Sequence, residues 1–306
     1  MQLAIEVQGL YKQFGTITAV DHIDLSVPNG QIFGLLGPNA AGKTTVIRLL
    51  AGIITSNAGT VNILGLDPKM QTTLIKQRIG YVAQHFALYP ELTVAENLAF
   101  YSGLYQSTDQ DKLQDLLNVY GLTSYAKQFA GTLSGGYKRR LSIACAVSHD
   151  PDLIFLDEPT AGIDPVTRKE IWDIFYDLAA TGKTLFVTTH YMEEAERCNQ
   201  LAFIHHGILV AQDTPNGIKH SLKGTKVFAC RAQYDPALSK TLCNVDGIKV
   251  LNQFGDELRI VVDEHISADH LKNIIVNNLN ENYDIYEVSV SIEDAFMTLT
   301  SSTVTQ

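Results

Sequence analysis

The sequence predicts an α/β fold with a small second domain, and two observations support this prediction. Short apolar runs such as "LIFLDEP" and "TLFVTTH" alternate with helical segments, as buried parallel strands and their crossover helices do. After "TPNGIKHSLKGT" a β-α-β-β-α-β order begins, which is typical of a separate unit. The 306 residues, 45% of them hydrophobic, suffice for one large core and one small core.

The composition disfavours several functional classes. A net charge of −10 argues against a protein that binds the phosphate backbone of nucleic acids. The four cysteines show no C-x-x-C spacing, so we expect reduced thiols rather than a zinc site or a disulfide framework. The N-terminus lacks the features of a secretory signal, and no apolar run reaches the roughly 18 residues of a membrane helix. Any membrane role is therefore expected to act through a partner.

The first part of the chain is predicted to be β-rich, since "LAIEVQGLYKQF" and "AVDHIDLSV" alternate apolar and polar residues before the strand-like "QIFGLLG". Helices are predicted over residues 42–52, 93–105 and 109–120. Thr93 and Glu96 form a capping box at the start of the second of these helices. We therefore expect an N-terminal antiparallel β-subdomain, an α/β core, and a helical subdomain inserted at about residues 85–147.

The C-terminal part is predicted to be a small α+β ferredoxin-like domain. "KVFACRAQ" and "DIYEVSVS" read as strands, and "GIKVLNQFGDELRIVVDE" reads as a hairpin that turns at Gly255 and Asp256. A terminal helix, "IEDAFMTLT", is expected to be capped by Ser291 and Asp294. We place the boundary near residue 222, which gives domains at 1–222 and 223–306.

The stretch "GPNAAGKTT" fits the pattern G-x-x-x-x-G-K-[ST] at Gly37, Gly42, Lys43 and Thr44. It follows a strand-like run and leads into a helix, which is the context that this pattern requires. Small residues let successive backbone N–H groups surround phosphate oxygens. The lysine reaches the β- and γ-phosphates, and the hydroxyl binds Mg²⁺. The sequence therefore predicts a P-loop NTPase core.

Two acidic residues follow the strand "LIFLDEP". Asp157 ends the strand, where a carboxylate can hold Mg²⁺, and Glu158 can orient and activate an attacking water. Gln84 after "IGYVA" could reach metal or water, and His190 after "TLFVTT" could contact the γ-phosphate. Both are weaker candidates, because a lone glutamine is usually a surface residue and a lone histidine is usually structural.

Other polar residues are predicted to be ordinary surface. The basic run 138–140 is interpreted as a solvated helix face, and His205 and His206 as an exposed hairpin turn.

Taken in order, these motifs resemble the ATP-binding subunit of ABC transporters over residues 1 to about 222. "GPNAAGKTT" matches the Walker A loop, "YVAQ" the Q-loop, "LSGGYKRRL" the signature, and "LIFLDEP" Walker B. "AGID" matches the D-loop, "TTH" the switch histidine, and "KQFG" supplies the aromatic residue that stacks on adenine. Two positions depart from the common pattern: Ala40 replaces Gly or Ser, and Tyr137 replaces Gln.

The resemblance implies an ATP hydrolase that uses ATP and Mg²⁺, and it implies the following roles. Catalysis is assigned to Glu158, His190 and Lys43, and Mg²⁺ binding to Thr44, Gln84 and Asp157. ATP binding is assigned to Phe14, Gly37, Pro38, Asn39, Ala40, Ala41, Gly42, Lys43, Thr44, Thr45 and Gln84. Ser134, Gly135, Gly136 and Asp164 are expected to contact the ATP of a partner subunit.

That last assignment implies a dimer. In the family, two domains face each other head to tail, so that the P-loop of one and the signature of the other enclose each ATP. "SGG" at a helix N-terminus offers N–H groups and a hydroxyl but no lysine, which suits a lid better than a complete phosphate site. We expect a homodimer, or a pseudo-dimer with a related ATPase subunit, and no nucleic acid partner.

The resemblance favours a transporter subunit that lies on the cytoplasmic face of the cell membrane and acts with a separate multi-spanning permease. "HFALYPELTVAENLAFYSGLY" resembles the region that receives the permease, although its aromatic residues also suit a core. The tail "YEVSVSIEDAFMTLT" resembles extensions of multidrug, polyketide-antibiotic and polysaccharide exporters. The alternative is a soluble ABC-type ATPase acting in an assembly process. The transported substrate and the role of the C-terminal domain stay open.

Overall fold

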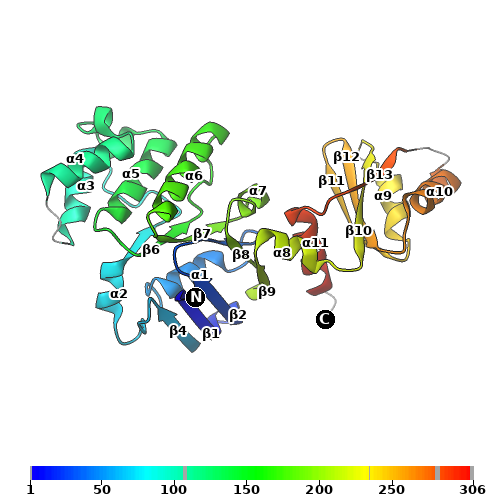
Figure 1. Ribbon diagram of the computed structural model, residues 1–306, viewed down its shortest axis with the longest axis horizontal. Coiled ribbons are helices and arrows are strands. Elements are labelled where there is room, and N and C mark those ends of the chain that lie inside the picture. Colours follow the sequence, from blue (N-terminus) through cyan, green and yellow to red (C-terminus); the bar gives the residue numbers. More distant parts are fainter. Residues whose placement is uncertain (1, 106–108, 234, 280–282, 304–306) are drawn as a thin grey trace. The chain divides into compact units, whose positions relative to one another are not determined.

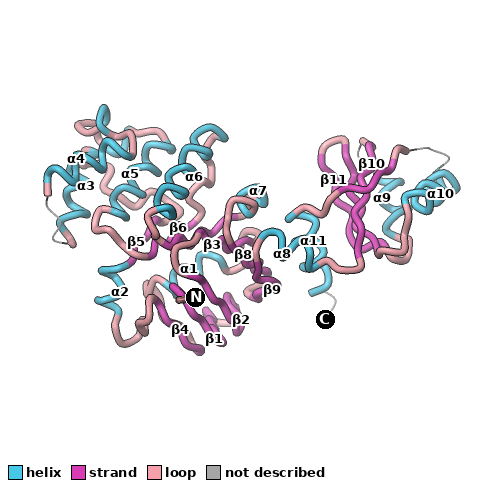
Figure 2. The backbone as a smooth tube through the Cα atoms, viewed as in Figure 1, coloured by secondary structure: helices cyan, strands magenta, loops and turns pink. Residues whose placement is uncertain are grey.

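The computed structural model describes residues 2–105, 109–233, 235–279 and 283–303. The chain forms two compact units, Met1–Gln212 and Asp213–Gln306. Figures 1 and 2 show that helices and strands alternate through most of the first unit. The sequence prediction put the boundary near residue 222; here helix α8 (Pro215–Ser221) falls in the second unit.

The first unit is built on a six-stranded sheet in the order β5-β6-β7-β3-β8-β9. Neighbouring strands from β5 to β8 run parallel. Every residue of β3, β6 and β7 is buried, which explains why these strands read as unbroken apolar runs. The strands are β3 (Ile32–Leu36), β5 (Ile79–Val82), β6 (Leu153–Asp157), β7 (Thr184–Thr189), β8 (Gln200–His205) and β9 (Ile208–Asp213).

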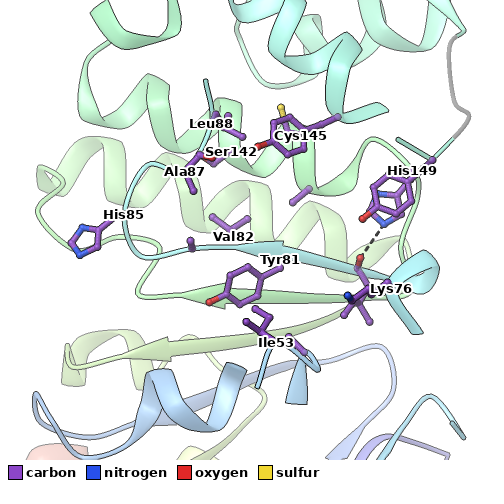
Figure 3. Close-up of a pocket in the computed structure, with 16 residues that line it drawn as sticks. Ile53, Lys76, Tyr81, Val82, His85, Ala87, Leu88, Ser142, Cys145 and His149 are labelled. Carbon is purple, nitrogen blue, oxygen red and sulfur yellow. Dashed lines mark hydrogen bonds between the residues drawn. The ribbon is translucent and has the colours of Figure 1, made fainter. Parts of the chain in front are cut away.

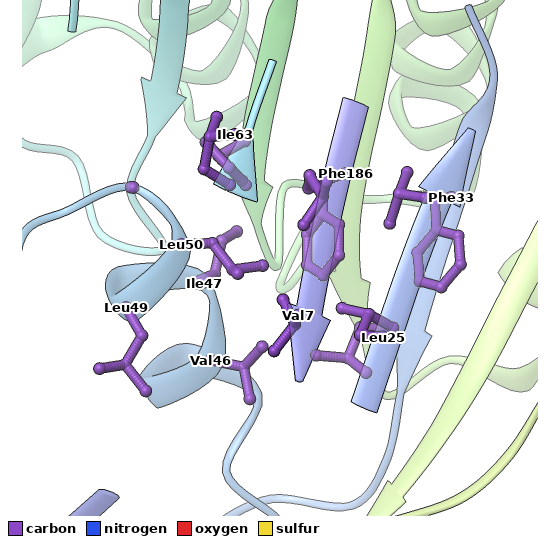
Figure 4. Packing of buried hydrophobic residues seen from close by; sticks show 14 of the residues in the cluster. Val7, Leu25, Phe33, Val46, Ile47, Leu49, Leu50, Ile63 and Phe186 are labelled. Carbon is purple, nitrogen blue, oxygen red and sulfur yellow. The ribbon is translucent and has the colours of Figure 1, made fainter. Parts of the chain in front are cut away.

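A three-stranded antiparallel sheet in the order β2-β1-β4 forms the predicted N-terminal subdomain. Its strands are β1 (Leu3–Phe14), β2 (Ile17–Pro28) and β4 (Ala58–Ile63). Helix α1 (Lys43–Leu50) places Val46, Ile47 and Leu50 in one buried cluster with Val7 of this sheet and Phe186 of the central sheet (Figure 4). This packing fixes the start of α1 beside both sheets.

The predicted insertion between β5 and β6 is helical. Its α-helices are α3 (Val94–Gly103), α4 (Gln110–Val119) and α5 (Gly135–Val147), with short 3₁₀ turns at Thr123–Tyr125 and Ala130–Thr132. The capping box is confirmed, because Thr93 and Glu96 exchange hydrogen bonds between each side chain and the other's backbone N–H. The remaining helices of this unit are α2 (Thr72–Arg78), α6 (Pro165–Ala180) and α7 (Met192–Ala195).

The second unit holds an antiparallel sheet in the order β11-β12-β10-β13. The predicted hairpin is present, with Phe254 paired to Glu257 across the turn. The predicted cap of the last helix is also confirmed, since the Asp294 carboxylate accepts from Ser291 N–H at 2.8 Å. Besides α8, the elements of the second unit are β10 (Thr225–Arg231), α9 (Pro236–Cys243), β11 (Ile248–Phe254), β12 (Glu257–Asp263), α10 (Ala268–Leu279), β13 (Ile285–Val288) and α11 (Ile292–Thr303).

Among the described residues of both units, no helix is long and apolar enough to cross a membrane.

Candidate functional site

The loop between β3 and α1 follows the path that its glycines permit. Gly42, the residue before α1, has φ 108°, and a Cβ there would lie 2.5 Å from the carbonyl oxygen of Ala19. A Cβ on Gly37 would collide with the carbonyl oxygen of Ile204. Both positions therefore require glycine. Gly42 is needed for its backbone conformation and its small size, and Gly37 is needed for its small size. The result is a loop that ends at the N-terminus of a buried helix, as the sequence predicts.

Lys43 lies beneath this loop and is almost fully buried. Its ammonium donates to the carbonyl oxygens of Gly37 at 2.8 Å and Pro38 at 3.0 Å, and lies 3.1 Å from a carboxylate oxygen of Glu158. A buried ammonium needs such partners, because removing it from water is costly. Two of the three partners are loop carbonyls, which a phosphate group can replace without leaving another charge unpaired.

A cavity of about 500 Å³ opens above the loop. The predicted ATP-binding residues that line it are Asn39, Ala40, Ala41, Gly42, Lys43, Thr44, Thr45 and Gln84, and Glu158 lines it too. The cavity wall also contains Ile17, Thr18, Ala19, His206 and Gly207, which sequence reasoning did not assign to the site. His206 is exposed, as predicted, yet it belongs to this wall.

Phe14 is not among the residues that line this cavity, and its ring is 48% exposed. It pairs with Ile17 across the turn between β1 and β2, and the Lys12 ammonium lies 4.8 Å from its ring centroid. The ring therefore stands next to a residue of the cavity wall, at the outer edge of the site.

Asp157 lies at the end of β6 with its carboxylate buried. One carboxylate oxygen accepts hydrogen bonds from Thr44 at 3.2 Å and from Thr188 at 2.8 Å. Burial raises the pKa of Asp157 above its usual range, and the two hydroxyl hydrogen bonds oppose that shift. A divalent cation bound here would favour the charged form. Thr188 is a supporting residue that the sequence did not single out.

Glu158 connects the other predicted residues. One of its carboxylate oxygens lies 3.2 Å from Gln84 Nε2 and 3.2 Å from His190 Nδ1, and the other lies near Lys43. Its backbone has φ 44°, and its N–H donates to Thr188 Oγ1 at 2.9 Å. The structure thus brings Lys43, Gln84, Glu158 and His190 together from four different segments.

Arg139 corrects the prediction that residues 138–140 form a solvated helix face. It is 9% exposed and donates to the carbonyl oxygens of Ala83 at 2.7 Å and Gln84 at 2.8 Å. Burial lowers the pKa of its guanidinium, and the nearby Asp157 charge opposes that shift. Arg139 therefore fixes the backbone at Gln84 from helix α5.

The signature residues lie at the start of α5. Ser134 caps the helix, and a Cβ on Gly136 would come within 2.5 Å of Thr167 on α6. Asp164 caps α6 by accepting from the N–H groups of Val166 and Thr167; the bonds from Thr167 are the main cause that lowers its pKa. Ser134, Gly136 and Asp164 thus share one region at two neighbouring helix N-termini, and none of them lines the phosphate-loop cavity.

Ala40 has φ 63°, a left-handed conformation that strains any residue with a Cβ. We expect Ala40→Gly to stabilise the first unit by about 1 kcal/mol or less, since relief of strain exceeds the added freedom of the unfolded chain. Thermal unfolding of the two proteins checks this, with nucleotide affinity as a second readout. An unchanged or lower Tm, with no gain in affinity, would show that Ala40 imposes no strain.

The chain is similar in sequence to ATP-binding proteins of ABC transporters and export systems. Residues 20–161 match the family model described as ABC transporter. The probable multidrug ABC transporter ATP-binding protein YbhF of Escherichia coli is 41% identical over 71% of this chain, which covers 38% of that protein. The Nod factor export ATP-binding protein I of Ralstonia nicotianae is 43% identical, over 78% of this chain and 75% of that protein. The linearmycin resistance ATP-binding protein LnrL of Bacillus subtilis is 33% identical over 98% of this chain and 99% of its own length.

Solved structures of ABC transporter ATP-binding subunits and cassettes are also similar to this chain. The structure of an ATP-binding subunit of an ABC transporter superimposes with a TM-score of 0.65 and 26% identity, over 71% of this chain and 92% of that one. A dimeric ATP-binding cassette in a post-hydrolysis state, bound to ADP and Pi, gives a TM-score of 0.62 and 25% identity over 69% and 98% of the two chains.

Proposed function

Because the chain belongs to the family of ABC transporter ATP-binding proteins, we propose that it binds and hydrolyses ATP as a dimer and thereby drives a separate membrane permease. The observation that carries this proposal is the cavity above the phosphate loop, where Lys43 and Glu158 meet. A cavity of about 500 Å³ is large enough for a nucleotide and is walled by both β-subdomain and P-loop residues.

In this proposal, Phe14 at the edge of the cavity stacks on adenine, and the loop from Gly37 to Thr45 surrounds the phosphates. When ATP binds, the Lys43 ammonium gives up its hydrogen bonds to the carbonyl oxygens of Gly37 and Pro38 and donates to phosphate oxygens instead. Thr44, Gln84 and Asp157 would hold Mg²⁺; the Thr44 hydroxyl and the Asp157 carboxylate already lie 3.2 Å apart, and oxygen ligands suit this ion. The metal would neutralise charge on the β- and γ-phosphates.

Glu158 then orients the attacking water and accepts its proton as the water oxygen bonds to the γ-phosphorus. The bond from phosphorus to the bridging oxygen of ADP breaks in the same displacement. This role requires Glu158 to be released from Lys43, because a carboxylate paired with an ammonium is a weaker base. His190, 3.2 Å from Glu158, contacts the γ-phosphate.

A second copy completes the site in this proposal. Ser134, Gly135, Gly136 and Asp164 lie away from the cavity of their own chain, so their N–H groups and hydroxyl serve the ATP of a partner. The dimeric relative bound to ADP and Pi supports such an arrangement. Two copies related by a two-fold axis would form two equivalent composite sites.

The permease is proposed to dock on the aromatic surface between the Q-loop and α3. Tyr89 and Phe100 are exposed and meet edge to face with ring centroids 5.1 Å apart, and Tyr101 and Tyr105 line an apolar cavity of about 370 Å³. Relatives named for multidrug transport, Nod factor export and linearmycin resistance support export as the direction. The protein would then lie on the cytoplasmic face of the membrane.

The C-terminal unit is proposed to be a ferredoxin-like domain. Its strand order, numbered along the unit, is 2-3-1-4, with all neighbours antiparallel, which supports this assignment.

Co-purification from gently solubilised membranes of the native cell tests the proposed function. We expect a stoichiometric multi-spanning membrane protein to accompany the tagged chain, and the complex to hydrolyse MgATP. A purely soluble complex that hydrolyses MgATP, with no chain on membranes, would instead support an ATPase acting in assembly.

A further inference from the structure

The apolar cavity beside the Q-loop continues into a second pocket of different chemistry. Figure 3 shows Lys76 and His149 together at one end of the apolar cavity, with Tyr81 and Val82 between that end and His85. A neighbouring pocket of about 520 Å³ shares Lys76, Tyr105 and His149 with the cavity. Its other lining residues are Thr73, Gln77, Leu104 and Lys112.

A stacked aromatic pair forms the wall common to both pockets. The rings of Tyr105 and His149 lie 3.7 Å apart and almost parallel, at 7°. His149 Nε2 donates to the carbonyl oxygen of Ile79 at 3.0 Å, since a carbonyl can only accept. Burial lowers the pKa of this imidazole, so His149 is neutral at physiological pH. The charge of the second pocket therefore comes from its lysines.

Within the described part of the chain, neither Lys76 nor Lys112 forms an ion pair, but Lys112 is near one carboxylate. The pKa of Asp150 is lowered mainly by its hydrogen bond with Lys183 and further by the charge of Lys112. Nearby acidic residues are already paired: Asp150 lies 2.6 Å from Lys183, and Asp152 lies 2.8 Å from Arg78. Within the ranges that the structure describes, no carboxylate lines the pocket. Because Asp150 is shared between Lys183 and Lys112, Lys76 and Lys112 leave an excess of positive charge beside the apolar cavity, in a chain whose net charge is −10.

We propose that this two-part groove selects a partner segment that places apolar side chains in the apolar cavity and a carboxylate side chain between Lys76 and Lys112. The inference rests on the proposed docking of a membrane protein at this surface, and it adds the chemistry by which that protein is recognised. Opposite charges at the end of an apolar contact set the register and orientation of a docked segment, because the reversed segment would leave both lysines unpaired.

Zero-length carbodiimide cross-linking in native membranes tests this proposal, since the reagent joins amines only to carboxylates. We expect cross-links from Lys76 or Lys112 to an aspartate or glutamate of the co-purifying membrane protein, identified by mass spectrometry of the complex. If the membrane protein co-purifies but its carboxylates couple to neither lysine, the proposal is wrong while the proposed function stands.

Charge reversal gives an independent readout. The double variant Lys76→Glu/Lys112→Glu is expected to weaken association with the membrane protein by about tenfold or more. The matched control Lys127→Glu/Lys240→Glu changes the net charge equally at two exposed lysines on other segments, and it is expected to associate like the wild type. Thermal unfolding of both variants verifies that they fold. Equal association of both double variants would overturn the proposal.

The test also separates other sources of negative charge. Flotation of the full chain with vesicles of phosphatidylglycerol and phosphatidylethanolamine tests lipid headgroups as the ligand; binding that Lys76→Glu/Lys112→Glu abolishes would overturn recognition of a protein carboxylate. If no membrane protein accompanies the wild-type chain at all, the proposed function fails and this inference fails with it.

Discussion

Replacing Glu158 with glutamine is expected to lower the rate of ATP hydrolysis by about three orders of magnitude while binding of MgATP is retained. Glutamine has nearly the same size, so the contacts with Gln84 and His190 can be kept, but an amide cannot accept the proton of the attacking water. The change also removes the charge that pairs with Lys43 at 3.1 Å. The ammonium then interacts with phosphate without competition from a carboxylate.

Phosphate release under single-turnover conditions measures the rate, and equilibrium titration with a fluorescent ATP analogue measures binding. Glu170→Gln is a matched control, because Glu170 also pairs with a basic side chain, Arg140 at 2.7 Å, but lies on an exposed part of α6. That control is expected to hydrolyse ATP at nearly the wild-type rate. A Glu158→Gln protein within about twofold of the wild type would remove Glu158 from the chemistry.

Ser134→Arg is expected to abolish hydrolysis, by about a hundredfold or more, without weakening the binding of ATP to the isolated subunit. Ser134 caps α5 and does not line the cavity of its own chain, so a large side chain there leaves that cavity open. In the composite site the same side chain would occupy the place of the partner's γ-phosphate. We therefore expect Ser134→Arg to lose ATP hydrolysis and to keep ATP binding.

Two comparisons make this result interpretable. Lys43→Ala is expected to lose ATP binding and hydrolysis together, because Lys43 lies in the cavity itself. Ser134→Ala removes the cap, at a cost of about 1 kcal/mol in stability, and also removes the hydroxyl proposed to contact the partner's ATP. It adds no bulk, so any further loss of hydrolysis in Ser134→Arg is due to the large side chain. If Ser134→Arg lost ATP binding as a monomer, Ser134 would belong to its own chain's site, and the composite arrangement would be wrong.

Most of the fold could be predicted from the sequence, and so could most of the residues that the structure brings together around the cavity. Unbroken apolar runs predicted β6 and β7 because parallel strands are buried on both faces, and the capping box at Thr93 and the hairpin at Gly255 are local signals. The phosphate loop was predicted for the same reason: its residue types are set by backbone geometry within one short segment.

What the sequence did not show depends on contacts between distant segments. Arg139 lies in a run of three basic residues that reads as a surface, yet it is buried because α5 packs against Ala83 and Gln84, more than fifty positions earlier in the chain. The sequence marked Ala40 as a departure from the usual Gly or Ser, but only its dihedral angle shows that the backbone there is left-handed. Thr188 is brought to the site by the order of the strands in the central sheet, and His206 is brought there by the turn between β8 and β9.

The most direct test of the proposed composite site is the solution mass of Glu158→Gln, measured by light scattering with saturating MgATP and again with MgADP. We expect about twice the monomer mass of 33.7 kDa with MgATP and the monomer mass with MgADP, because only the γ-phosphate joins the P-loop of one copy to the signature of the other. A protein that binds MgATP to saturation and stays monomeric would contradict it.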